Sequence, residues 1–282
     1  SLQAAVRFNE GQVMDFLGYR NKRVIVSGCF SGMGEATARQ LLALGAQVHG
    51  IDYKETGLEL ASFNQVDLRD PAAIDAAIAK IGGKVDALFN CAGLPQTAPA
   101  LDVMKVNYAG TRRVTERVLP LMSAGGAIAS ISSTGGLGWS RRMPVLMQLL
   151  SIDDYEAALR WCEEHPDDVK EGYTLSKEAI IVWTMLFSQR LVKQGIRINC
   201  TLPSPTQTPM MSHFESATPA AVIDTFTLPT GRRSTPEEQA GALILLNSAA
   251  AGFVNGVVLP VDGGFMGGLT TGQIDLGKIM SR

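Results

Sequence analysis

Tyr173 and Lys177 are the residues whose types and spacing point most directly to chemistry. Residues four apart share one face of a helix, so the lysine ammonium can lie beside the phenol. A phenol has a pKa of about 10, and a neighbouring positive charge favours its ionised form. Such a tyrosine could exchange a proton with an alcohol or carbonyl oxygen. By itself the pair could also be chance, because the chain has five tyrosines that could each precede a lysine.

Three glycines at Gly28, Gly32 and Gly34 suggest where a nucleotide binds. They follow the first apolar run of the chain and open a helical pattern. Backbone N–H groups at such a turn, together with the positive end of the helix, can hold a pyrophosphate. A glycine-rich turn alone is weak evidence, since any connection from a strand to a helix can contain one. Its position directly after the first strand strengthens the nucleotide interpretation.

Asp52 ends the next apolar run and bears on the choice of dinucleotide. A carboxylate at this position can accept hydrogen bonds from both ribose hydroxyls and would repel a 2′-phosphate. The alternative is a strand-end aspartate that starts a turn. We expect NAD as the cofactor, although Lys54 and Arg69 leave room for NADP.

Short apolar runs alternate with helical patterns from Arg23 onwards. Expected strands are residues 23–27, 47–52, 63–66, 85–90, 127–132, 196–202 and 256–261. Expected helices lie near residues 33–44, 71–81, 101–122, 173–194 and 235–250. Nearly continuous apolar strands separated by helices indicate a parallel sheet that is covered on both faces. The sequence therefore predicts one doubly wound α/β domain of the Rossmann type, with seven parallel strands, over residues 1–282.

Residues 134–172 do not fit this alternation and are expected to form a helical insertion on the substrate side, just before Tyr173. Ser151 could cap a helix that Pro166 ends. The apolar segment 143–150 precedes it. Residues 1–20 form a leader of unassigned role, and residues 266–282 form a glycine-rich and then amphipathic tail.

Composition bounds the class of protein. The 282 residues are 46% hydrophobic and 18% charged, with a formal net charge of −2. This balance lacks the basic footprint of a nucleic-acid binder, and no apolar run reaches the roughly 18 residues of a membrane span. The four cysteines and three histidines show no metal-ligand spacing, so we expect buried or partly buried thiols and no metal. The first residues lack a signal-peptide pattern, which favours a cytoplasmic protein.

Several motifs in order resemble those of the short-chain dehydrogenase/reductases, over roughly residues 20–265. The glycine loop is similar to TGxxxGxG, Asn90-Cys91-Ala92-Gly93 to NNAG, and Ser130–Ser133 to the NISS strand end. Tyr173 and Lys177 match YxxxK, and Pro203-Ser204-x3-Thr208 resembles PGxxxT with serine in place of glycine. Asp262-Gly263-Gly264 resembles the late DGG. Together these matches are far more specific than any one of them.

The resemblance implies an NAD-dependent oxidoreductase that acts on CH–OH and C=O groups. The implied catalytic residues are Asn107, Ser133, Tyr173 and Lys177. The implied cofactor contacts, besides Tyr173 and Lys177, are Gly28, Ser31, Gly32, Met33, Gly34, Asp52, Tyr53, Asp67, Leu68, Cys91, Ala92, Gly93, Pro203, Thr206 and Thr208. Asn107 is expected to hold a water for proton relay, and Ser133 to donate to the substrate oxygen. Ser133 could otherwise simply cap a turn.

The long insertion is similar to that of the 3α-hydroxysteroid dehydrogenase/carbonyl reductase subgroup. It implies a lipophilic secondary alcohol, steroid-like or cyclic, or its ketone. Candidate substrate contacts are Ser133, Trp139, Met147, Tyr173 and Met211, and Met143, Leu146, Leu150 and Phe214 are further candidates. A lining rich in methionine adapts to bulky apolar ligands. Half of these residues could instead bury the insertion against the domain.

Other functions remain open from sequence. The chain could be a catalytically silent nucleotide-binding regulator, or a carbonyl reductase for small non-steroid ketones. Enoyl reduction or sugar epimerisation on the same fold fits less well, because enoyl reductases usually separate tyrosine and lysine further and epimerases carry a longer substrate domain. The resemblance also implies a homodimer or homotetramer.

Overall fold

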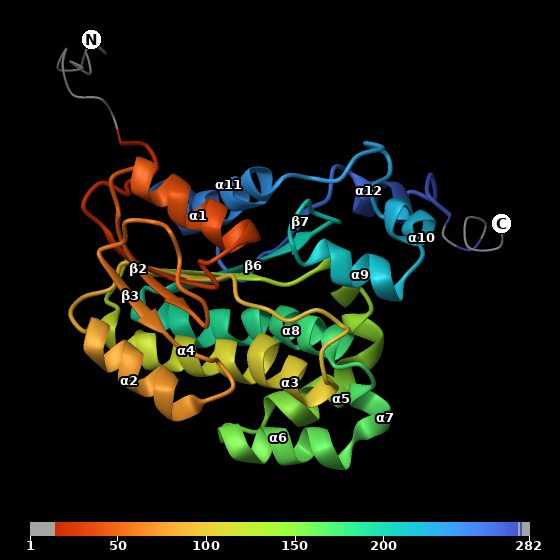
Figure 1. The fold of residues 1–282 in the computed structure, drawn as a ribbon, viewed down its shortest axis with the longest axis horizontal. Coiled ribbons are helices and arrows are strands. Elements are labelled where there is room, and N and C mark those ends of the chain that lie inside the picture. Colours follow the sequence, from red (N-terminus) through yellow and green to blue (C-terminus); the bar gives the residue numbers. More distant parts are fainter. Residues whose placement is uncertain (1–14, 276, 278–282) are drawn as a thin grey trace, which may run out of the picture.

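The computed structural model describes residues 15–275 and 277, which form one α/β domain around a seven-stranded sheet (Figure 1). Every neighbouring pair of strands is parallel, and the strand order is β3-β2-β1-β4-β5-β6-β7. The strands are β1 (Arg23–Ser27), β2 (Gln47–Asp52), β3 (Ser62–Gln65), β4 (Ala87–Asn90), β5 (Ala127–Ile131), β6 (Arg197–Pro203) and β7 (Val258–Val261). The predicted doubly wound fold is therefore confirmed, with strand ends shifted by at most two residues.

Helices cover both faces of the sheet (Figure 1). α1 (Gly32–Ala43) and α11 (Pro236–Asn247) lie on one face. α2 (Pro71–Ile81), α3 (Ala100–Met104), α4 (Thr111–Val118) and α8 (Tyr173–Leu191) lie on the other. Successive strand side chains point to opposite faces, so Ile25 joins the core under α8 whereas Val24 and Val26 join the core under α1. The apolar residues of each strand are thus divided between two cores.

The strand order changes direction at β1. β2 and β3 are added on one side of β1, and β4 to β7 are added on the other. Ser27 at the end of β1 is in register with both Ile51 and Asn90. In open parallel sheets, ligands bind outside the carboxyl ends of the strands at such a switch point. Short helices lie around this end of the sheet: α9 (Met211–Ala217), α10 (Ala220–Thr225) and α12 (Phe265–Thr270).

The helix expected near residues 101–122 is confirmed as a continuous helical segment, in which a π-helical turn at Lys105–Gly110 joins α3 to α4. A 3₁₀ turn at Leu119–Leu121 then ends the segment. Single π turns inside α-helices are frequent at functional sites. This one contains Asn107.

The insertion before Tyr173 is helical, as predicted, and comprises α5 (Met143–Leu150), α6 (Tyr155–Glu164) and α7 (Pro166–Val169). The predicted cap at Ser151 is wrong. α6 begins at Tyr155, and the Asp154 side chain accepts a hydrogen bond from the Ala157 N–H at 2.8 Å. The insertion packs below α3 and α8, on the far side of these helices from the sheet (Figure 1).

Part of the leader and of the tail lies outside the described residues. Within the described part, the phenol of Tyr19 donates to the Ile244 carbonyl of α11 at 2.7 Å, which holds residues near the start of β1 against that helix. No helix among the described residues has the length and apolar character to cross a membrane. The four cysteines are free, and three of them are buried.

Candidate active site

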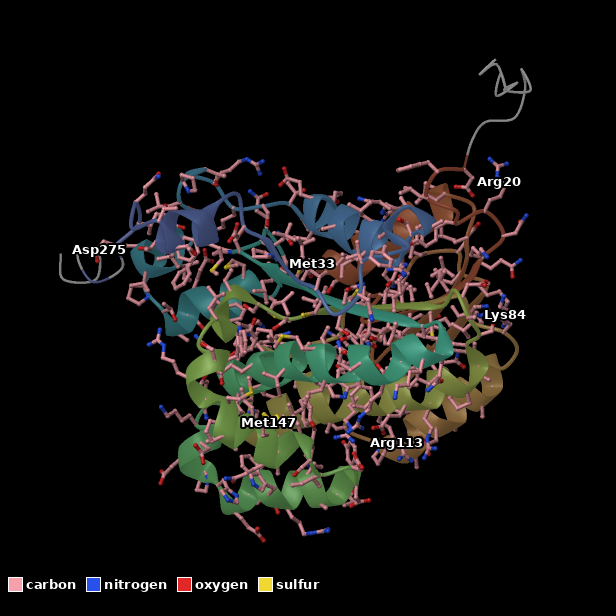
Figure 2. All side chains as sticks on the ribbon, turned by 180° about the vertical axis from the view of Figure 1, so that it is seen from behind. Arg20, Met33, Lys84, Arg113, Met147 and Asp275 are labelled. Atoms are coloured by element: carbon pink, nitrogen blue, oxygen red, sulfur yellow. The ribbon has the colours of Figure 1, made fainter. Side chains whose placement is uncertain are left out.

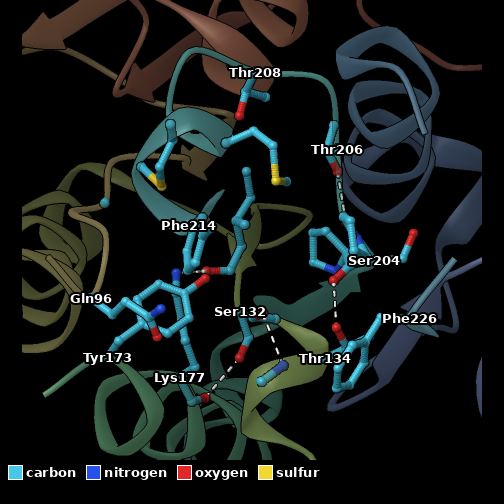
Figure 3. Close-up of a pocket in the computed structure, with 18 of the residues that line it drawn as sticks. Gln96, Ser132, Thr134, Tyr173, Lys177, Ser204, Thr206, Thr208, Phe214 and Phe226 are labelled. Atoms are coloured by element: carbon cyan, nitrogen blue, oxygen red, sulfur yellow. Dashed lines mark hydrogen bonds between the residues drawn. The ribbon is translucent and has the colours of Figure 1, made fainter. Parts of the chain in front are cut away.

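A cavity of about 250 Å³ opens at the carboxyl end of the sheet (Figure 3). Its walls come from the ends of β4, β5 and β6, the start of α8, and the α9–α10 segment. Eleven of the residues expected at the cofactor or substrate line it: Met33, Cys91, Gly93, Ser133, Tyr173, Lys177, Pro203, Thr206, Thr208, Met211 and Phe214. Most of the remaining wall is apolar. The topological switch point and the chemically active side chains therefore meet in one cavity.

Tyr173 is the first residue of α8, directly after Gly172. Gly172 has a φ of +78°, and a Cβ there would lie 2.5 Å from the Ala100 carbonyl oxygen. Only glycine fits this turn without displacing α3. The turn aims the Tyr173 ring into the cavity, where the Phe214 ring meets it edge-on at a centroid distance of 5.1 Å (Figure 3).

Lys177 follows one helical turn later and is buried. Its Nζ atom donates to the Ile131 carbonyl at 3.1 Å and lies 5.5 Å from the centre of the Tyr173 ring. Removal from water disfavours the charged ammonium and lowers the pKa of Lys177 to about 8. The predicted proximity of the two side chains is thus present in the structure.

The pKa of Tyr173 is raised, because burial disfavours the phenolate. The nearby Ser133 hydroxyl, which would stabilise the phenolate, opposes this shift without reversing it. The net direction is opposite to the lowering expected from Lys177. The physical reason is that the interior removes water from the phenol as well as from the lysine.

Ser133 follows the end of β5. Its surroundings are compatible with both roles considered from the sequence, which are capping a turn and donating to the substrate oxygen. Its Oγ accepts a hydrogen bond from the Gly135 N–H at 3.0 Å and so caps a short 3₁₀ turn. This contact leaves the hydroxyl hydrogen available toward the cavity. The neighbouring Ser132 instead donates to the Lys177 carbonyl at 2.7 Å and joins β5 to α8.

Asn107 is buried, and its amide is occupied by protein contacts. Its Oδ1 accepts from the Leu94 N–H at 2.6 Å, and its Nδ2 donates to the Leu94 carbonyl at 3.0 Å and to the Ser176 hydroxyl at 3.3 Å. Both amide hydrogens are used, so the side chain could hold the expected water only through the second lone pair of Oδ1. In the structure Asn107 positions the loop after β4 against α8.

The glycine loop packs against the loop that follows β4. A Cβ at Gly34 would collide with the Gly28 carbonyl oxygen, and Gly28 has a φ of +77° with the Ala92 main chain directly beside it. A pyrophosphate would bind to the main chain of this loop at the start of α1. Met33 of the same segment reaches the cavity, whereas Ser31 and Gly32 are not in its wall.

Asp52 is buried at the end of β2. Its carboxylate accepts hydrogen bonds from the Phe30 N–H of the glycine loop at 2.9 Å and from the Lys54 N–H at 3.1 Å. An ionised carboxylate accepts about four hydrogen bonds, so capacity remains for ribose hydroxyls. The side chain both starts a turn and orients the nucleotide loop.

The two cations that left NADP open have other contacts. Arg69 pairs with Asp67 at 2.6 Å and with Asp102 at 2.9 Å. The Nζ of Lys54 lies 5.1 Å from the centre of the exposed Tyr53 ring. The Asp67 carboxylate is therefore already paired with Arg69. Leu68, the other residue expected to contact the cofactor here, is buried beside Gly110 of the π turn.

The loop after β6 is built by hydrogen bonds between its own residues and α11. Thr206 donates to the Ser204 carbonyl at 2.8 Å and lies 2.9 Å from the Ser234 hydroxyl. Gln239 of α11 donates to the same Ser234 oxygen at 2.9 Å. Ser204 does not require the left-handed backbone region that its usual glycine could adopt. The substitution is therefore compatible with an ordinary loop.

Of the insertion, only Thr134 and Gly135 at its start line the cavity, and Trp139 and Met147, which were expected there, do not. Trp139 packs against the hydrophobic core, and Met147 is exposed. Figure 2 shows Met147 on the insertion, on the opposite side of the sheet from Met33. Leu146 and Leu150 are buried under α8. The apolar face of α5 is used to bury the insertion itself, which was the alternative interpretation.

The cavity is instead lined by residues of two segments that were not predicted from the sequence to contact the substrate. Gln96 and Leu94 extend from the loop after β4. From α9, α10 and the residues around them come Met210, Thr218, Val222, Ile223 and Phe226. The sequence held one signal for this segment: it directly follows the loop of Thr206 and Thr208, which is expected to contact the cofactor.

Comparisons with known proteins agree with this geometry. A family model described as short chain dehydrogenase matches residues 22–145, and one described as Enoyl-(Acyl carrier protein) reductase matches residues 165–266. The chain is 34% identical over 245 residues to a coniferyl-alcohol dehydrogenase of Pseudomonas sp. (strain HR199 / DSM 7063), covering 86% of this chain and 96% of that protein. It is 30% identical over 249 residues to a 3-alpha-hydroxysteroid dehydrogenase/carbonyl reductase of Comamonas testosteroni, with 86% and 95% covered.

A solved structure is similar over nearly the whole domain. It is a 3-alpha-hydroxysteroid dehydrogenase from Pseudomonas sp. B-0831 complexed with NADH, with a TM-score of 0.76 and 27% identity, covering 89% of this chain and 99% of that one. The sequence motifs, the fold and the similar proteins therefore all indicate the same family. The chain belongs to the short-chain dehydrogenase/reductase family and is an oxidoreductase that acts on alcohols and their carbonyl counterparts.

Proposed function

We propose that this protein interconverts a lipophilic cyclic secondary alcohol and its ketone with NAD(H), using Tyr173 as general acid and base. The observation that carries the proposal is that Tyr173, Ser133 and Lys177 line one apolar cavity at the switch point of the sheet. Bound nicotinamide would supply the hydride acceptor or donor. The remaining task of the protein is to bind the substrate oxygen and to move its proton.

Each polar side chain has a separate part in that task. The Ser133 hydroxyl donates to the substrate oxygen and so stabilises the negative charge that develops there. Tyr173 gives its proton to this oxygen in reduction and takes it back in oxidation. Burial raises the pKa of Tyr173, so its protonated form is ready for reduction at neutral pH. Oxidation requires the phenolate, which the Lys177 ammonium stabilises while it stays charged below about pH 8.

The choice of NAD rests on the charges around Asp52. A ribose with free hydroxyls can donate to the carboxylate, whereas a 2′-phosphate would lie against a buried negative charge. Arg69, one of the two cations that could help to bind NADP, is paired with two aspartates. The NADH complex of the relative from Pseudomonas sp. B-0831 supports the same choice. A structure similar only at the level of the fold holds NADP, so the comparison alone leaves the choice open.

An aromatic primary alcohol is a second candidate substrate. The relative with 34% identity is a coniferyl-alcohol dehydrogenase, and the cavity wall contains Phe214 and Phe226. The volume of about 250 Å³ lies below the roughly 300–1,000 Å³ typical of ligand pockets, and it must also accept the nicotinamide. The small volume and the space that the nicotinamide needs both favour a substrate smaller than a steroid.

A silent nucleotide-binding regulator is disfavoured, because such a protein has no need of Ser133, Tyr173 and Lys177 at one cavity. A homodimer or homotetramer remains a proposal. It is supported by exposed Leu245, Phe253 and Val254, and light scattering after gel filtration would test it. Location in the cytoplasm also stays a prediction.

The test is a panel of cyclic, aromatic and steroid alcohols and ketones with NAD(H) and NADP(H), followed by nicotinamide absorbance at 340 nm. Tyr173→Phe should lower turnover by about 10²–10⁴-fold while NAD still binds. Tyr155→Phe is the matched control, since that phenol contacts the Arg69 carbonyl away from the cavity. Unchanged turnover in Tyr173→Phe would remove the mechanism, and turnover of small charged hydroxy acids alone would remove the substrate class.

A further inference from the structure

One part of the cavity wall is polar and is not explained by proton transfer. Gln96 comes from the loop after β4, and Thr218 lies between α9 and α10. The Gln96 Nε2 atom donates to the Thr218 Oγ1 atom at 3.1 Å. Neither residue is among the contacts expected for the cofactor. The pair therefore belongs to the substrate side of the cavity.

The pair keeps hydrogen-bonding capacity that faces no protein group. Within the described part of the chain, the Gln96 Oε1 atom accepts no hydrogen bond. The Thr218 Oγ1 atom accepts from Gln96, and its own hydrogen has no acceptor among the described residues. A glutamine carbonyl and a threonine hydroxyl together offer one acceptor and one donor. This combination matches an oxygen substituent, above all a hydroxyl group.

The rest of the wall restricts the body of the ligand. Among the described residues that line the cavity, Lys177 is the only one with a charged side chain. An anionic ligand would therefore have no second cation to pair with, and a neutral ligand fits better. Phe214, Ile223 and Phe226 provide apolar area for a flat ring. The small volume, shared with nicotinamide, leaves room for one ring system better than for four fused rings.

We propose that the substrate is a neutral, single-ring alcohol, or its aldehyde or ketone, that carries a second oxygen substituent bound by Gln96 and Thr218. This proposal rests on the function proposed above and specifies its substrate class. Gln96 and Thr218 are specificity residues in it. They bind the second oxygen, while Tyr173 and Ser133 bind the oxygen that reacts.

A purely structural role for the pair is the competing explanation, because the pair also joins the α9–α10 segment to the loop after β4. Other contacts hold the same segment. Thr97 lies 3.4 Å from the His213 ring nitrogen, and Arg233 pairs with Glu215 at 2.6 Å and with Asp224 at 3.3 Å. A fastening role would therefore act on all substrates alike. A recognition role would act only on substrates with the second oxygen.

The experiment compares matched ring alcohols with and without a ring hydroxyl: benzyl alcohol, 1-phenylethanol, and their ortho-, meta- and para-hydroxy forms. In the wild type, kcat/KM should be higher by roughly fivefold or more for at least one hydroxylated form, the worth of about one hydrogen bond. Gln96→Met and Thr218→Val keep side-chain size and should bring this ratio close to one. Thr97→Val, which loosens the same segment outside the cavity, should leave the ratio as in the wild type.

A preference ratio that stays at its wild-type value in both Gln96→Met and Thr218→Val overturns the proposal, and so does a wild type without preference. Binding of the same compounds to the protein with NAD, followed by calorimetry, separates this failure from that of the proposed function. Binding selective for the hydroxyl without any turnover contradicts the proposed function and supports the recognition. Turnover without selectivity contradicts only the recognition.

Discussion

The Nζ atom of Lys177 donates a hydrogen bond to the carbonyl oxygen of Ile131 at 3.1 Å. This contact joins α8, the helix that begins with Tyr173, to the last residue of β5, two positions before Ser133. The lysine, the tyrosine of the same helix and the serine after the same strand are thereby held together. The arrangement places an ammonium group in a buried position, and its pKa of about 8 reflects the cost.

Lys177→Met should remove this cost and stabilise the protein at pH 7 while lowering turnover. The shift of the Lys177 pKa from 10.5 to about 8 corresponds to a destabilisation of the folded state by about 3 kcal/mol. Loss of the hydrogen bond to Ile131 in the variant offsets about 1 kcal/mol of this gain. A lowered lysine pKa means that the unfolded chain binds more protons between pH 8 and 10.5, so wild-type stability rises across that interval. The advantage of the variant should therefore shrink from pH 7 to pH 10, as measured by urea unfolding. A variant less stable than the wild type at pH 7 would contradict this account.

Asp52→Asn should weaken the preference for NAD over NADP. The amide oxygen can still accept from the Phe30 N–H, so the glycine loop keeps its contact while the negative charge is lost. Asp52→Ala loses both and should also bind NAD more weakly. Titration of each variant with NAD and NADP, read by protein fluorescence, gives the ratio. A wild type that prefers NADP, or an unchanged ratio in Asp52→Asn, would show that the carboxylate does not select the cofactor.

Gly34→Ala should abolish NAD binding or unfold the domain. A Cβ at this position meets the Gly28 carbonyl oxygen of the rigid turn, so either the loop or α1 has to move. Gly57→Ala is the matched control, because a Cβ there has nothing within 4 Å. Thermal unfolding with and without NAD distinguishes the two outcomes. Normal binding and stability in Gly34→Ala would mean that the loop is not as tightly packed as described.

Arg142→Met should destabilise the protein and make its stability depend on pH. Arg142 of the insertion pairs at 2.9 Å with Glu178, a buried carboxylate of α8. Removing one partner of a buried pair costs roughly 3 kcal/mol. Burial raises the pKa of Glu178, and loss of the arginine raises it further.

A raised carboxyl pKa means that the folded state binds more protons, so the stability of Arg142→Met should fall as the pH rises from about 4.5 toward neutrality. Urea unfolding at pH 5 and pH 7 measures the slope. The double variant Arg142→Met/Glu178→Gln removes the unpaired charge and should recover part of the stability at pH 7. A loss of equal size at both pH values would argue against an unpaired buried carboxylate.

The sequence predicted the fold because its signals are local. Apolar runs such as 23–27 and the helical patterns between them follow from residue periodicity, which needs no knowledge of the partner elements. The glycine loop, Asp52 and the Tyr173–Lys177 pair were also readable, because each depends on spacing within one element or on one connection. Element ends were less certain. The π turn around Asn107 and the cap at Asp154 depend on what the helices pack against.

The cavity wall could not be read in the same way, because it is assembled from segments far apart in the chain. Met147 and Met211 are both methionines in apolar segments, yet the first is exposed and the second lines the cavity. Composition cannot separate them, since either could bury a helix or contact a ligand. By itself the sequence predicted the reaction type and the place of the cofactor, through residues close in the chain. Only the tertiary structure decided that the α9–α10 segment and Gln96, and not the helices of the insertion, line the cavity, because which apolar face is buried depends on the surfaces available to cover it.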